Sequence, residues 1–159
     1  MTWLPIHFRK NVLRTPFIGQ ESGGALVELG ITISILSCFL LGAGEFGRLA
    51  YAAIEVSNAA HAAAAYGAQT HTTASDTSGM KSIASSDAAN VSGMTATPTH
   101  FCVCSNGSSS TCAATDCATS RIIEYVQVNT SATFDPKIYV PGLPKSYNLK
   151  AQAIMRVMQ

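Results

Sequence analysis

The sequence predicts an α+β protein, in which a long N-terminal helix precedes a small exported domain with a short helix and an antiparallel sheet of about three strands. Three observations support this fold class. An apolar stretch near the N-terminus runs into an alanine-rich stretch, segments with strand-like alternation follow Gly93, and Gly, Ser and Pro separate these segments. We expect three parts: a leader at 1–23, a helix at 24–69 and an exported α+β domain at 70–159.

The apolar stretch has the length of a membrane-spanning helix. The 21 residues from Gly24 to Gly44 contain one charged residue, Glu28. About 20 residues suffice for a helix to cross the hydrocarbon core of a bilayer. A carboxylate is costly inside that core, so Glu28 is expected to have a functional role and a partner.

Basic residues in the leader predict how the helix is oriented. Within the first 27 residues the only acidic residue is Glu21, whereas the basic residues are Arg9, Lys10 and Arg14. Cationic segments flanking a membrane helix stay on the cytoplasmic side. We therefore expect a single-pass protein with a cytoplasmic N-terminus, and with everything after about residue 45 exported.

Small residues precede the apolar stretch, at Ser22, Gly23 and Gly24. A secretory signal peptide instead has its small-residue cleavage site after the apolar core. Processing at these glycines would therefore leave the hydrophobic helix on the mature protein.

The helix is predicted to continue beyond the membrane. Glu45 and Arg48 form an i,i+3 charge pair that marks the juxtamembrane region, and 10 of the residues from Leu49 to Ala68 are alanine. Because small side chains let helices approach closely, we favour lateral packing of this segment against other helices in an assembly. The alternative is a stalk helix covered by its own domain.

The exported part is predicted from turn and alternation signals. Residues 70–80 are expected to be a polar loop, and Met80–Val91 a short helix capped by Ser78. A Gly/Ser-rich turn is expected at 105–111, and a proline-containing loop at 136–144. Strands are predicted at 101–104, 121–134 and 149–158.

Four of the five cysteines lie in the exported part, at Cys102, Cys104, Cys112 and Cys117. In an oxidising compartment an even set in a small domain favours two disulfides. Pairing Cys102 with Cys104 is the least favoured, because alternate residues of a strand lie too far apart for a disulfide. The two other pairings remain open, and a zinc site with four thiolate ligands is the less favoured alternative, because its spacing lacks C-x2-C pairs. Cys38, in the apolar stretch, is interpreted as a buried small hydrophobe.

No catalytic or cofactor-binding pattern is present in the sequence. His61 has no acidic partner at helical spacing and is interpreted as a lone polar side chain on an exposed helix, and His71 lies ten residues further on, in the expected polar loop. The Gly42-x-Gly44-x-x-Gly47 pattern follows an apolar helix rather than a strand, so it does not indicate a dinucleotide site. The net charge of +1 offers no basic patch for nucleic acid. We therefore expect a protein that is not an enzyme, with no cofactor, no metal and no nucleic-acid partner.

The N-terminal pattern resembles the TadE-like minor pilins (pseudopilins) of tight-adherence, or Flp-type, type IVb pilus systems. The resemblance covers about 45 residues, through Ser22-Gly-Gly-Ala-Leu-Val-Glu28-Leu, the apolar run, Glu45-Phe-Gly-Arg48 and the alanine-rich continuation. Type IV prepilins carry a basic leader that an inner-membrane peptidase cuts after a glycine, with a glutamate at mature position five. The resemblance implies cleavage after Gly23, which makes Gly24 the new N-terminus and Glu28 the fifth residue. Leu29 differs from the aromatic residue that Flp-type pilins usually have next to this glutamate.

The resemblance also implies a role, a location and a set of partners. The α-amino group of Gly24 on one subunit would pair with Glu28 of a neighbour and set the register between subunits. The expected partners are other minor pilins, the major Flp pilin, the prepilin peptidase, the assembly platform and membrane lipid. The expected location is the bacterial inner membrane, with the C-terminal domain in the periplasm. The expected function is initiation or regulation of pilus assembly in adhesion. The alternative is a permanently anchored periplasmic binding or scaffold module that never enters a filament.

Overall fold

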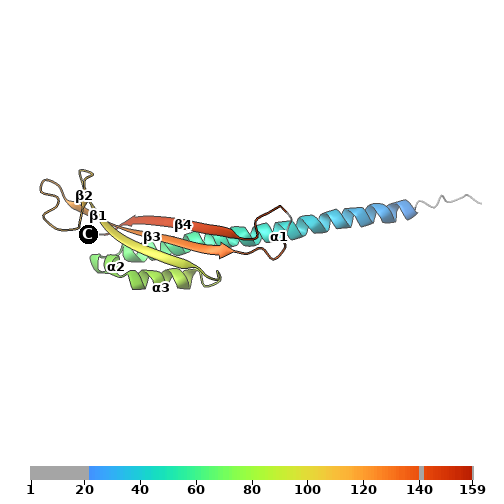
Figure 1. Cartoon of the computed structure of the whole chain (residues 1–159), viewed down its shortest axis with the longest axis horizontal. Helices are drawn as coiled ribbons and strands as arrows, with labels where there is room; N and C mark the ends of the chain where they lie inside the picture. The colour runs from blue at the N-terminus through green and yellow to red at the C-terminus, as the bar shows by residue number, and fades with distance from the viewer. Residues whose placement is uncertain (1–21, 140–141, 159) are drawn as a thin grey trace, which may run out of the picture. The chain divides into compact units, whose positions relative to one another are not determined.

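The computed structural model describes residues 22–139 and 142–158 (Figure 1). These residues divide between Phe39 and Leu40 into two units, which we call the first and the second unit. The predicted leader, 1–23, lies outside the described residues except for its last two positions. The described part of the first unit is helix only. The second unit combines helices with a four-stranded sheet, so the predicted α+β class is confirmed.

Helix α1 spans Ser22–Gly67, close to the predicted range. Alanine is the strongest helix former and no proline interrupts the segment, so its local sequence favours a continuous helix. In the second unit, one stripe of α1 with helical spacing is buried against the rest of that unit. The stripe consists of Ala52, Val56, Ala59, Ala60, Ala63 and Ala64, and Ala68, directly after the helix, is buried as well.

This stripe corrects the expectation that the alanines pack against helices of other subunits. Ala59, Ala60, Ala63 and Ala64 are fully buried in the core of their own domain. Small side chains allow a sheet to approach as closely as a helix would, so alanine content alone did not identify the partner. The alternative, a helix covered by its own domain, describes the face of the segment that this stripe forms, whereas Ala50, Ala53 and Ala65 are exposed.

The predicted polar loop at 70–80 was wrong, because a short helix, α2, spans His71–Ser75. Thr70 caps α2 in a reciprocal arrangement. The Thr73 N–H donates to Oγ1 of Thr70 at 3.2 Å, and the Thr70 N–H donates to Oγ1 of Thr73 at 2.9 Å. Both donors would otherwise lack an intrahelical partner, so this capping box starts the helix.

Helix α3 spans Thr77–Asp87, earlier than predicted, and its N-cap is Asp76 rather than Ser78. The carboxylate of Asp76 accepts from the N–H of Gly79 at 2.9 Å and from the hydroxyl of Ser78 at 2.7 Å. It also accepts from the hydroxyl of Tyr66 in α1 at 2.9 Å. These hydrogen bonds, led by the one from Gly79, lower the pKa of Asp76.

The sheet has four antiparallel strands in the order β2-β1-β3-β4. β3 and β4 lie close to their predicted positions, β1 is longer than predicted, and β2 falls within the predicted turn. The strand bounds are Thr95–Cys104 for β1, Ser109–Ser110 for β2, Ile122–Phe134 for β3 and Tyr147–Arg156 for β4.

Proline explains why only the last part of β1 was predicted. Pro98 lacks a backbone donor and argues against a central strand. In the structure β2 pairs only with Cys102 and Val103, so Pro98 lies where β1 forms the edge of the sheet. The pairing with β3 nevertheless extends along β1 from Thr95 to Cys104.

The three helices cover one face of the sheet, and the other face is open (Figure 1). The alternation predicted for residues 122–129 of β3 is confirmed, since Val126 and Val128 are fully buried. They join the α1 alanines, Met80 and Val157 in one core. Thr130 is also buried, and its hydroxyl donates to the Val56 carbonyl of α1 at 2.7 Å.

Candidate functional site

The N-terminal part of α1 is long and apolar enough to cross a membrane. Its most apolar window of 18 residues has a mean hydropathy of 2.1, and none of that window is buried within the protein. It is the one helix of this kind among residues 22–139 and 142–158, and it is compatible with a single-pass membrane anchor. Cys38, interpreted from sequence as buried, is exposed on this helix.

The predicted assembly and processing residues lie at the start of this helix. Gly23 and Gly24 belong to its first turn, Glu28 follows one turn later, and Glu28 and Leu29 are both exposed. Within the part of the chain that the structure describes, no hydrogen bond or ion pair to Glu28 is present. The pairing of this carboxylate with another subunit stays a prediction.

Glu45 and Arg48 lie together where the apolar stretch ends. Nη1 of Arg48 donates to both carboxylate oxygens of Glu45, at 2.9 and 3.1 Å. The guanidinium of Arg48 also lies 5.4 Å from the ring centroid of Phe134, a cation–π distance. The carboxylate of Glu45 also accepts a hydrogen bond from the backbone N–H of Lys137 at 3.3 Å. These contacts join α1 to the segment that follows β3.

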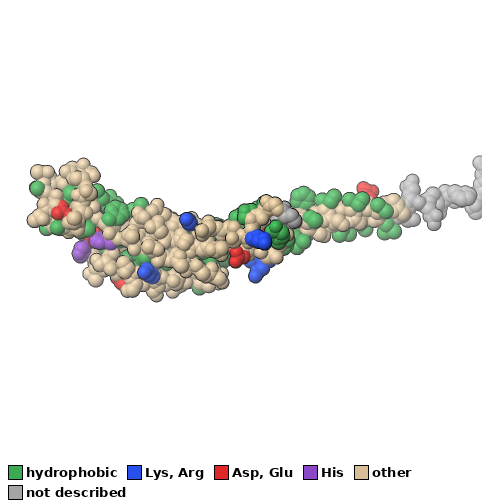
Figure 2. All heavy atoms as spheres, viewed as in Figure 1, with side chains coloured by type: hydrophobic (Ala, Val, Ile, Leu, Met, Phe, Trp, Pro, Cys, Tyr) green, Lys and Arg blue, Asp and Glu red, His purple; other side chains and the backbone are tan. Residues whose placement is uncertain are grey.

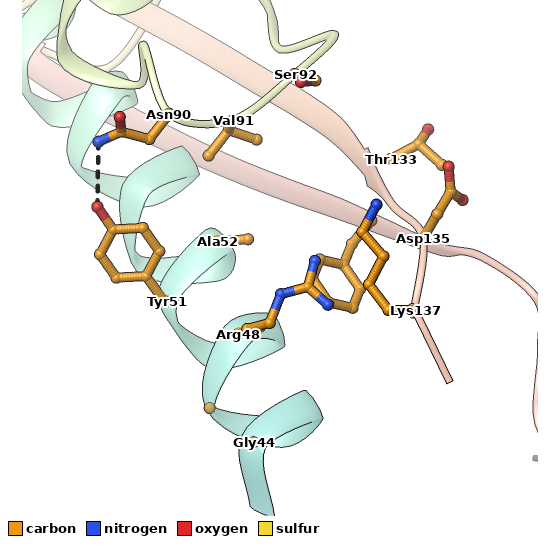
Figure 3. Close-up of a pocket in the computed structure, with 12 residues that line it drawn as sticks. Gly44, Arg48, Tyr51, Ala52, Asn90, Val91, Ser92, Thr133, Asp135 and Lys137 are labelled. Atoms are coloured by element: carbon orange, nitrogen blue, oxygen red, sulfur yellow. Dashed lines mark hydrogen bonds between the residues drawn. The ribbon is translucent and has the colours of Figure 1, made fainter. Parts of the chain in front are cut away.

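A groove of about 540 Å³ opens beside this charge pair (Figure 3). Its α1 side combines two glycines, Gly44 and Gly47, with the larger side chains of Arg48 and Tyr51. The hydroxyl of Tyr51 accepts a hydrogen bond from the side chain of Asn90 at 3.2 Å. Figure 3 shows the Arg48 and Lys137 side chains on the same side of the groove. The groove brings together α1, the segment after α3 and the segment after β3.

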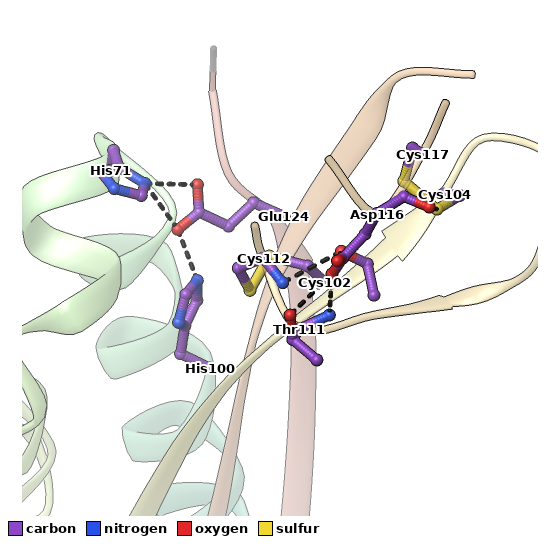
Figure 4. Close-up of a disulfide and its surroundings, with 10 residues drawn as sticks. His71, His100, Cys102, Cys104, Thr111, Cys112, Asp116, Cys117 and Glu124 are labelled. Atoms are coloured by element: carbon purple, nitrogen blue, oxygen red, sulfur yellow. Dashed lines mark hydrogen bonds and ion pairs between the residues drawn. A yellow bond between two sulfur atoms is a disulfide. The ribbon is translucent and has the colours of Figure 1, made fainter. Parts of the chain in front are cut away.

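A second cluster joins α2 to the sheet through Glu124 (Figure 4). The Glu124 side chain is only 6% exposed, and both of its oxygens lie within 2.9 Å of Nδ1 of His71. Nε2 of His100 lies 2.5 Å from Oε1 of Glu124. The two groups are not aligned as a hydrogen bond, and they form an ion pair only when His100 is protonated. The hydrogen bond to Glu124, together with its negative charge, raises the pKa of His71.

The structure therefore gives His71 a partner that no sequence pattern indicated. His71 and Glu124 are 53 residues apart in the sequence. A search at helical spacing misses such a pair, because it meets only when α2 packs against β3. His61, in contrast, is exposed on α1, as the sequence indicated.

All four cysteines of the second unit are disulfide-bonded, Cys102 to Cys112 and Cys104 to Cys117. This is one of the two pairings that the sequence left open. A ligand atom of His100 lies within 4.8 Å of both sulfurs of the first pair, which is a metal-ligand spacing. With those sulfurs bonded to each other, however, neither is a thiolate, which is the form that binds zinc.

Asp116 organises the loop that the two disulfides close. Its carboxylate accepts from the hydroxyl and the N–H of Thr111, at 2.7 and 2.6 Å, and from the hydroxyl of Ser110 at 3.1 Å. The bonds from Thr111 are the main cause of the lowered pKa of Asp116. Covalent and polar links therefore constrain this loop together.

Comparisons with known proteins found one match, to the N-terminal helix. The chain matched no curated protein and no solved structure. The family model described as "TadE-like protein" matches residues 23–65, which cover almost all of α1 and include Glu28, Glu45 and Arg48. The match covers the part of the chain that carries the sequence resemblance, and it is to the same TadE-like family that the resemblance indicated.

Proposed function

We propose that this protein is a minor pilin of a Tad/Flp type IVb pilus, which takes part in initiating or regulating assembly of the pilus in adhesion. The family match indicates association with the Tad pilus. The role of a minor pilin rests on one observation. The matched segment is an apolar helix, and its only charge between Gly24 and Gly44 is Glu28. The C-terminal domain would lie in the periplasm, because the basic leader stays in the cytoplasm.

In this proposal the α-amino group of Gly24 on another subunit is the partner of Glu28. Cleavage after Gly23 creates that amino group at the membrane surface, next to a helix that carries a carboxylate one turn later. Pairing the two groups removes the cost of leaving either charge alone in hydrocarbon, and it allows only one axial register between neighbouring helices. The other minor pilins and the major pilin are the proposed sources of this amino group.

Cleavage of the leader has a simple signature, because the single tryptophan of the chain is Trp3. A protein processed after Gly23 contains no tryptophan and shows no tryptophan emission. N-terminal sequencing of protein purified from membranes should then begin at Gly24. A protein that keeps Met1 and its tryptophan emission in cells with an active prepilin peptidase would contradict the cleavage step.

Replacing Glu28 tests the assembly role directly. With Glu28→Gln as the only copy in a bacterium that makes Tad pili, we expect loss of surface pili with normal amounts of protein in the membrane. The matched control is Glu55→Gln, which removes a carboxylate of the same helix beyond the apolar stretch. Normal piliation with Glu28→Gln would contradict the pilin role and favour the permanently anchored module.

A further inference from the structure

The segment that joins β3 to β4 exposes apolar side chains. Its described residues are 135–139 and 142–146, and we call them the β3–β4 segment. Three of its large hydrophobic residues are substantially exposed, Ile138 at 40%, Tyr139 at 60% and Leu143 at 49%. An exposed apolar group of this kind is typical of a surface that contacts a partner or a membrane.

Contacts with α1 hold this segment at the end of the apolar stretch. The Lys137 N–H donates to Glu45, and Arg48 lies over the ring of Phe134, where β3 ends. Glu45 is the first charged residue after Glu28, with 16 uncharged residues between them. A helix that crosses a bilayer with this stretch places Glu45 in the headgroup region. The β3–β4 segment lies at the same level, because it contacts Glu45 directly.

The chemistry of the segment matches the interface between lipid and water. Nζ of Lys145 lies 5.6 Å from the ring centroid of Tyr139, and Lys137 adds a second cation next to the exposed Ile138. Tyrosine rings are enriched at headgroup level, and lysine extends its ammonium toward the phosphates while its stem contacts apolar groups. Figure 2 shows basic and hydrophobic side chains gathered where this segment meets α1.

We propose that the β3–β4 segment inserts Ile138, Tyr139 and Leu143 into the headgroup layer of the membrane that α1 crosses, with Lys137 and Lys145 on the lipid phosphates. The occupant of this surface is the phospholipid bilayer itself. This inference rests on the proposed membrane anchoring of α1. It adds a second attachment, which fixes the rotation and the tilt of the exported domain above the bilayer.

The test uses single tryptophans in the full-length chain, in a Trp3→Phe background and reconstituted into phosphatidylethanolamine–phosphatidylglycerol vesicles. Tyr139→Trp reports on the segment. Phe39→Trp, in the apolar stretch, reports on the anchor. His61→Trp is the matched exposed control, since position 61 lies about 24 Å along α1 from Glu45 at 1.5 Å per residue.

Lipids brominated near the top of their acyl chains should quench Tyr139→Trp, because interfacial groups are buried about 5–10 Å into this boundary. Aqueous acrylamide should quench it several times less than His61→Trp. If Phe39→Trp is quenched by brominated lipids and Tyr139→Trp is not, the inference fails while the anchor stands. If neither is quenched, the anchor fails and the inference fails with it. Protection from acrylamide without quenching by lipid would identify a protein contact at this surface and would also overturn the inference.

Discussion

Gly67, the last residue of α1, packs so closely on the core that a single added methyl group tests the packing of the second unit. A Cβ at this position would lie 2.6 Å from Sδ of Met80 and 2.9 Å from Cγ1 of Val126. Both neighbours are fully buried, so neither can move into solvent. Overpacking of this kind costs about 1–3 kcal/mol, and replacing a helical glycine by alanine returns about 0.5–1 kcal/mol. We expect Gly67→Ala to destabilise the protein by about 1–2 kcal/mol.

Thermal unfolding of the full-length chain in detergent, followed by near-ultraviolet circular dichroism, measures this effect. For a unit of this size, 1 kcal/mol shifts Tm by about 3–6 °C, so we expect Tm to fall by about 5 °C. The matched control is Gly47→Ala, because a Cβ at Gly47 meets nothing within 4 Å and only the helical gain remains. The control should have a Tm equal to that of the wild type or above it. If the Tm of Gly67→Ala is then also unchanged or raised, the packing of α1 against Met80 and Val126 is refuted.

Three further predictions concern the rest of the second unit. Because Glu124 raises the pKa of His71 above 6.5, the stability that this pair contributes is fully present below pH 6.5 and is lost as the pH rises through the raised pKa. His71→Gln should therefore lower Tm at about pH 6 but not at about pH 9, and an equal loss at both values would argue against the pair. Removing one disulfide, with Cys104→Ala and Cys117→Ala together, should cost about 3 kcal/mol in denaturant unfolding, since the bond joins residues 13 apart; no loss would mean that it does not form. Thr130→Val keeps the shape but loses a buried hydrogen bond to α1, so denaturant unfolding should show a loss of about 1 kcal/mol, and a gain in stability would count against that bond.

The helices around residues 70–87 show where sequence patterns were insufficient. Thr, Ser and Gly have weak helix propensity, which favoured a loop at 70–80. In the structure, Thr70 caps α2 and Asp76 caps α3, and Ala74 and Met80 are fully buried in the core. Most helix stability in proteins comes from such tertiary packing, so burial outweighed the weak propensity.

In the candidate site, too, some residues were predicted from the sequence and others were found only in the structure. Glu28 was singled out as the one charge of the apolar stretch, and the family resemblance implied the roles of Gly23 and Gly24, which stay predictions. The contact between Glu45 and Arg48 was predicted from helical spacing, and the structure contains it. The pair of His71 and Glu124, and the link from Lys137 to Glu45, join residues 53 and 92 positions apart. Such contacts depend on which strand and which helix become neighbours, and no local pattern encodes that choice.

By itself the sequence determined the apolar helix with its single carboxylate, the alternation of β3 and the supply of four cysteines for two disulfides. These features follow from local rules, since hydrophobic length and period depend on neighbouring residues alone. Only the tertiary structure decided that the alanines of α1 pack against their own sheet, which cysteines pair, and which loop lies beside Glu45. Each of these depends on bringing distant segments together, where close packing selects one arrangement among several that the local patterns allow.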